Sequence, residues 1–99
     1  MQSHYPAQFD REMGCTETEW LGWLPEAMGN VAWQQTPNSA HAQLGTGSLD
    51  IFWQTGEPRR IALISMPRLL VKFRFEGLND DQRYTFMKRF DLYMQRGGG

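Results

Sequence analysis

The sequence is poor in the residues that build disulfides and metal centres. It holds one cysteine, Cys15, and two histidines, His4 and His41. A single cysteine excludes an intramolecular disulfide and any multi-cysteine zinc site. Acidic residues flank Cys15 on both sides and disfavour the thiolate that a nucleophile needs. We therefore expect a structural role for Cys15 and no cofactor.

Long apolar runs are also missing. None approaches the roughly 20 residues that span a bilayer, and the N-terminus lacks the basic start and apolar stretch of a signal peptide. The sequence therefore predicts a cytoplasmic protein with no membrane partner. A chain of 99 residues has the length of one domain. Its hydrophobic fraction of 40% and aromatic fraction of 13% exclude the disordered class and indicate a compact core.

Basic residues are nearly absent from the first half of the chain. Between residues 1 and 57, Arg11 is the only lysine or arginine, and the net charge of −1 conceals this asymmetry. Such an asymmetry can indicate an anionic partner. Neutralisation of one half by the other, within the folded chain or between copies, is the simpler explanation and the one we favour.

Turn residues and capping motifs divide the chain into three parts. Residues 1–14 have little periodicity and predict an extended or partly ordered arm, residues 15–96 a single α+β domain, and residues 97–99 a flexible glycine tail. Thr16 and Glu19 match a capping box and predict the start of a helix. That helix is expected to end or kink near Leu24, because Pro25 lacks the N–H that the next turn requires, and Gly29 closes the segment.

Short strands separated by turns fill residues 30–76 and predict a meander, in which each strand pairs with the next one in sequence. The turn at Pro37-Asn38 sets Trp33 opposite Ala42, and a Thr46-Gly47 turn sets Leu44 opposite Leu49. Residues 59–66 are expected to form the fourth strand, with Ala62 lying between Ile51 and Val71. One face then becomes apolar, with these members: Val31, Trp33, Ala40, Ala42, Leu44, Leu49, Ile51, Trp53, Ala62, Ile64, Leu69, Val71, Phe73 and Phe75.

A second helix is predicted after the last strand. Asn79 is the expected N-cap, with Asp80 and Asp81 in the first turn and Gln82 at the capping-box position. Apolar residues then recur at spacings of three and four. The predicted fold is α+β: a five-stranded antiparallel meander sheet with an N-terminal and a C-terminal helix packed on one face.

The other face of this sheet is predicted to lack a cover, and any function is expected there. Its centre would be an apolar patch of Phe52, Ile61, Leu63 and Leu70. Exposed apolar patches with polar rims mark partner surfaces, and two-fold association is the commonest kind. We therefore expect a non-catalytic accessory module that forms a homodimer or binds another protein. In the competing account, Tyr5 and Phe9 of the arm fold across this face.

The same face predicts an alternative function. Its basic rim and one histidine form a candidate anion-binding set: Arg59, Arg68, Lys72, Arg74 and His41. Such a set could hold an anionic ligand or a single-stranded nucleic acid stacked on Phe52. The pI near 6.1 and the lack of an RNP-type aromatic motif make nucleic acid the weaker hypothesis.

No residue pattern predicts an enzyme. Asp50 and His41 fall on neighbouring strands and could form an acid–base pair, but a flat sheet face lacks the cleft that such a pair needs. The glycine end invites comparison with the diglycine tails of ubiquitin-like carriers, which follow a strand. Here residues 97–99 follow a helix, so a helix cap at Gly97 is the favoured interpretation.

Overall fold

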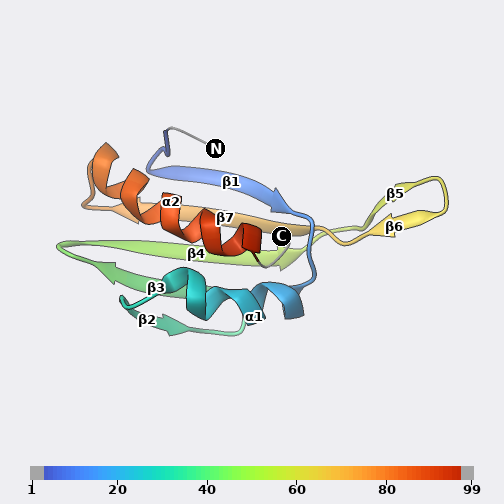
Figure 1. The fold of residues 1–99 in the computed structure, drawn as a ribbon, viewed down its shortest axis with the longest axis horizontal. Coiled ribbons are helices and arrows are strands. Elements are labelled where there is room, and N and C mark those ends of the chain that lie inside the picture. Colours follow the sequence, from blue (N-terminus) through green and yellow to red (C-terminus); the bar gives the residue numbers. More distant parts are fainter. Residues whose placement is uncertain (1–3, 97–99) are drawn as a thin grey trace.

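The computed structural model describes residues 4–96, which form one sheet, two helices and a separate hairpin (Figure 1). In chain order the elements are β1 (Gln8–Met13), α1 (Glu17–Met28), β2 (Ala32–Gln35), β3 (Ser39–Leu44), β4 (Gly47–Thr55), β5 (Arg59–Ile61), β6 (Ile64–Met66), β7 (Leu69–Glu76) and α2 (Asp80–Arg96). The sheet has the strand order β1-β7-β4-β3-β2, and every neighbouring pair is antiparallel. The predicted α+β class is confirmed, with the first helix internal rather than N-terminal.

The predicted meander is wrong at its fourth strand. β4 pairs directly with β7, which sets Ile51 opposite Phe73 and Trp53 opposite Val71, whereas β5 and β6 form a two-stranded hairpin outside the sheet. Pro58 and Pro67 bracket this hairpin, and neither can donate a hydrogen bond to a strand ladder. The chain therefore leaves the sheet between the two prolines and returns for β7.

The N-terminal arm supplies the fifth strand instead. β1 pairs with the outer side of β7 and sets Phe9 opposite Phe73, where their rings stack with centroids 4.8 Å apart. Tyr5 is buried in the same core. Both aromatic residues thus lie on the helix side of the sheet, and the account in which they cover the opposite face is wrong.

The β2–β4 part of the sheet follows the prediction closely. Trp33 lies opposite Ala42, as expected. β3 and β4 are joined by a two-residue loop that sets Leu44 opposite Gly47 and Ala42 opposite Leu49, two positions away from the predicted register. Because side chains alternate along a strand, a shift of two residues leaves every side chain on its predicted face.

α1 begins at the predicted capping box. The Glu19 N–H donates to the Thr16 hydroxyl at 3.1 Å, and the Thr16 N–H donates to the Glu19 carboxylate at 2.9 Å. The helix then continues through Pro25 to Met28, so of the two predicted outcomes, an end or a kink near Leu24, the end is wrong. Burial of the last turn against the core offsets the hydrogen bond that the proline cannot make.

Glycine and asparagine define the remaining helix ends. Gly29 closes α1 with a positive φ of 73°, and its N–H donates to the Pro25 carbonyl at 3.1 Å. At the start of α2 the Asn79 side chain accepts from the Gln82 N–H at 2.9 Å, and the Gln82 side chain accepts from the Asn79 N–H at 2.8 Å. The predicted second cap is therefore confirmed. The expected cap at Gly97 lies outside the described residues.

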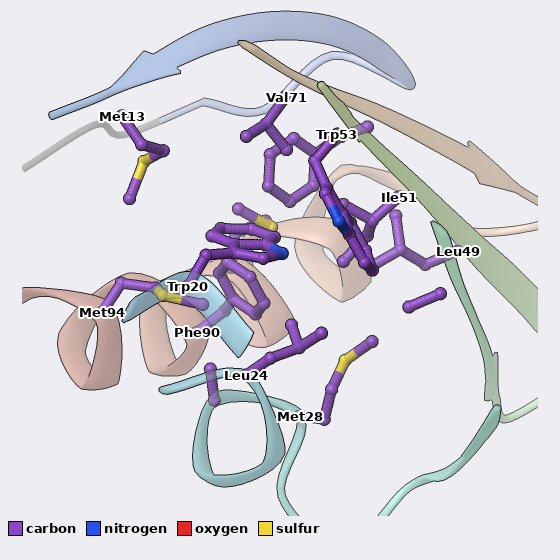
Figure 2. Packing of buried hydrophobic residues seen from close by; sticks show 14 of the residues in the cluster. Met13, Trp20, Leu24, Met28, Leu49, Ile51, Trp53, Val71, Phe90 and Met94 are labelled. Atoms are coloured by element: carbon purple, nitrogen blue, oxygen red, sulfur yellow. The ribbon is translucent and has the colours of Figure 1, made fainter. Parts of the chain in front are cut away.

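Both helices lie on the same face of the sheet, as Figure 1 shows, and the core fills the space between them. Trp20 of α1 sits at its centre, with ring centroids 5.7 Å from Trp53 and 6.1 Å from Phe90 of α2 (Figure 2). Phe90 in turn meets Phe73 edge-on. Most of the predicted core face is fully buried. Ala62 and Ile64 were predicted in this core but are exposed on the hairpin.

Candidate functional site

The sheet face opposite the helices is not covered by any described helix or strand. On its central strand, β4, Phe52 keeps 43% of its surface exposed. Leu70 of β7 is half-buried one diagonal step away, because Phe52 faces Lys72 and Leu70 faces Gln54. Phe52 and Leu70 therefore form a small apolar centre on an otherwise polar face, which we call the sheet patch.

Acidic and basic side chains alternate around the sheet patch. The register places Arg74 between Gln8 of β1 and Asp50 of β4. The next row places Lys72 between Asp10 and Phe52. Each positive side chain therefore has a carboxylate on a neighbouring strand, and the face carries no uniform sign of charge.

Glu12 of β1 forms ion pairs with two members of the predicted anion-binding set, Arg59 and Arg68. Its carboxylate accepts from Arg59 at 3.0 Å and from Arg68. These contacts attach the base of the hairpin to the edge strand, and they place a carboxylate beside both guanidinium groups, where it repels an incoming anion. Arg74, Lys72 and His41 lie on the sheet face itself.

The two predicted hairpin members of the interface stand apart from the sheet patch. Ile61 and Leu63 lie in or beside the β5–β6 hairpin, which projects from one end of the sheet (Figure 1). A hydrogen bond of 2.8 Å from the Gly56 N–H to the Arg68 carbonyl closes the base of this projection. The structure thus divides the predicted apolar patch into the sheet patch and a separate hairpin surface.

The hairpin surface is the most exposed apolar group of the described residues. Leu63 is fully exposed, Ile61 and Ile64 are 60% and 63% exposed, and Met66 is 44% exposed. The sequence pattern assigned Met66 to no surface and placed Ile64 in the core. The bracketing prolines were the feature that could have identified this segment as an excursion from the sheet.

His41 and Asp50 form the one candidate acid–base pair. They lie directly opposite each other, with 2.7 Å between His41 Nδ1 and Asp50 Oδ1. A shallow hollow of about 380 Å³ adjoins His41 and is lined by Gln43, Ser48 and Glu76. It is open to solvent along the sheet, so it supplies neither the enclosure nor the dryness that general acid–base catalysis uses. Nor does any group of three metal-ligating side chains occur within residues 4–96.

A second hollow lies on the helix side and was not foreseen from the sequence. It occupies about 460 Å³ between the start of α2 and the β3–β4 loop, with apolar contributions from Leu44, Leu78 and Phe86. Arg89, on its rim, donates to the carbonyls of Glu26 and Ala27 and so caps the C-terminal end of α1. The guanidinium of Arg89 is thereby committed to joining the two helices.

The sequence matches no protein-family model, and no curated protein matches it. Neither described helix has the length and apolar character required to cross a membrane. The function is therefore inferred from geometry and charge.

Proposed function

We propose that this protein is a non-catalytic interaction module that self-associates through its open sheet face. The observation that carries this proposal is the exposure of Phe52 on the central strand. A large aromatic side chain at the middle of an uncovered sheet has apolar area to bury and is the residue type that dominates protein interfaces.

The alternating charges around the sheet patch support a second copy as the partner. Two-fold association brings the same face of both copies together, so each positive group needs a negative group nearby on that same face. Arg74 with Asp50 and Lys72 with Asp10 meet this requirement. The centre of the contact is therefore Phe52, with Leu70 beside it, while Ile61 and Leu63 lie at the end of the molecule.

Binding of an anionic ligand or single-stranded nucleic acid is the alternative. Its support is that Lys72 and Arg74 are exposed beside Phe52, which could stack on a base. Against it stand the neighbouring carboxylates and the attachment of Arg59 and Arg68 to Glu12. Titration with a labelled oligonucleotide at low salt tests this alternative: binding that weakens steeply with salt and in Arg74→Glu supports it.

The test of self-association is the mass in solution, measured by light scattering at high micromolar protein concentration. Wild type should have twice the chain mass of 11.5 kDa, and Phe52→Lys should be monomeric. Leu92→Lys is the matched control, because Leu92 on α2 has the same 43% exposure but lies away from the sheet face. A monomeric wild type, or a dimer that survives Phe52→Lys, would sink the proposal.

A further inference from the structure

The β5–β6 hairpin changes in polarity along its own length. Ile61 faces Ile64 in the outermost pair, with Ala62 and Leu63 beyond it at the turn. We call these four residues the hairpin tip. Leu63 is fully exposed, and the two isoleucines of the tip are more than half exposed. The far end of the hairpin is therefore apolar and in contact with solvent.

Arginines surround the base of the same hairpin. Arg60 faces Ser65 in the next pair and Arg59 faces Met66 in the innermost pair, so alternation directs the two guanidinium groups to opposite sides of the hairpin. Arg68 follows where the chain rejoins the sheet. We call these three arginines the hairpin neck. Residues 58–75 contain no acidic residue.

We propose that this hairpin inserts its tip into the surface of an anionic lipid bilayer, with the neck at the level of the headgroups. A bilayer has an anionic surface above an apolar interior. The hairpin complements this arrangement, because its basic neck lies behind its apolar tip. Side chains of the tip would leave water for the acyl boundary, while the arginines would pair with lipid phosphates or carboxylates. Contact of this kind requires no transmembrane segment.

The shape and charge of the hairpin favour a lipid surface over a protein partner. The hairpin extends beyond the rest of the molecule (Figure 1), so its tip can reach a flat surface before any other element does. A bilayer accepts a convex apolar tip without a matching cavity. Packing the hairpin against its own copy would bring two sets of neck arginines together, and like charges at an interface oppose association.

Glu12 sets the electrostatic balance of the neck. Its carboxylate accepts from both Arg59 and Arg68, whereas Arg60 has no ion pair among the described residues. Arg60 is therefore the neck residue whose charge is most available to an anionic headgroup. The inference does not depend on the sheet patch, because Phe52 and Leu63 belong to separate surfaces.

Cosedimentation with unilamellar vesicles tests the inference on the full chain. Phosphatidylcholine vesicles containing about 30 mol% phosphatidylserine should carry wild type down, and pure phosphatidylcholine vesicles should do so much less. Leu63→Asp should lower the partition coefficient more than about tenfold, and Arg60→Glu should lower it on the anionic vesicles. Leu92→Asp is the control for an exposed leucine elsewhere and should bind as wild type does.

Each other outcome overturns the inference. If wild type does not sediment with the anionic vesicles at millimolar lipid, or if Leu63→Asp sediments equally well, the tip does not insert. Millimolar inorganic phosphate that displaces the protein would show binding to a phosphate group alone. If wild type does not sediment with vesicles but Leu63→Asp changes the mass of the protein in solution, the hairpin contacts another protein molecule instead.

Discussion

Trp20 and Trp53 meet across the core with ring planes inclined by 56°, and neither indole N–H has an acceptor among the residues that the structure describes. Each side chain therefore contributes a large apolar area and also carries the cost of an unpaired donor. The centre of this protein is held by packing rather than by hydrogen bonds.

Substitutions at Trp20 should separate these two effects. Trp20→Ala opens a cavity and should reduce the free energy of unfolding by about 3–5 kcal/mol. Trp20→Phe keeps a ring in place and removes the unpaired N–H, so it should reduce the free energy of unfolding by less than about half of that amount. Urea denaturation followed by circular dichroism measures both values. Equal losses for the two variants would contradict this division.

Asp91 should be the most important charged residue for stability. It accepts from the Tyr5 hydroxyl at 2.8 Å and from Arg11 Nη1 at 2.6 Å, and it thereby attaches α2 to the N-terminal segment. Asp91→Ala leaves both groups unpaired where Arg11 is only 20% exposed, and should cost about 2–4 kcal/mol. Asp80→Ala removes an exposed partner of Arg83 and should cost less than about 1 kcal/mol. Chemical denaturation of the two variants side by side checks the difference, and similar losses would count against it.

The buried thiol should make stability fall at alkaline pH. Burial, assisted by the negative charge of Glu19, raises the pKa of Cys15 from 9.0 to about 11. An unfolded chain loses this proton near pH 9 while the folded chain keeps it, so the contribution is complete below pH 9 and is lost as the pH rises to about 11. Wild type should lose roughly 2–3 kcal/mol in that interval through this group.

Cys15→Ala isolates the contribution of the thiol. It should flatten the dependence of unfolding free energy on pH between about 9 and 11, whatever its own effect at neutral pH. Tyr5 affects a higher interval, because burial and its hydrogen bond to Asp91 raise the pKa of its phenol from 10.0 to about 12. Identical slopes for wild type and Cys15→Ala below about pH 10 would show that the thiol does not contribute.

Two glycines should respond in opposite directions to alanine. A Cβ at Gly47 would collide with the carbonyl of Glu76 and lie 2.8 Å from that of Gly77, so Gly47→Ala should cost about 2–3 kcal/mol. Gly22 is exposed within α1, and a Cβ there would meet no other part of the described chain within 4 Å, so Gly22→Ala should stabilise by about 0.5–1 kcal/mol. Thermal unfolding of both variants decides the signs, and a neutral Gly47→Ala would show that the end of β7 yields easily.

Local patterns predicted the parts of the fold that depend on neighbouring residues. The capping boxes at Thr16 and Asn79 define helix starts through contacts three residues apart. Alternation along β3 and β4 identified the core face correctly, although the predicted register between these two strands was two positions off. The face of each side chain is predicted correctly in such a case, because side chains alternate along a strand and a register shift of two residues returns each one to the same face.

Pairing between distant segments could not be predicted in the same way. β1 was missed as a strand because Arg11 interrupts the apolar alternation of Phe9 and Met13. The position of Arg11 on the core side is explained by distant residues, namely Asp91 of the last helix and the ring of Phe73. Ile61 and Ile64 continue an apolar pattern that is as typical of a strand in the main sheet as of a strand in a separate hairpin. The sequence predicted the sheet patch at Phe52. Its separation from the hairpin could not be predicted, because it depends on which strands pair with each other.

The pairing of β1 with β7 also has a consequence for synthesis in the cell. Translation makes β1 and Trp20 well before it makes β7, the partner strand of β1, and α2, the helix that packs on Trp20. A nascent chain therefore exposes Phe9 until Phe73 of β7 has been made, and exposes part of Trp20 until Phe90 of α2 has been made. Chains that lack β7 and α2 are therefore expected to be targets for chaperones and proteases, because the core can close only after both segments have been made.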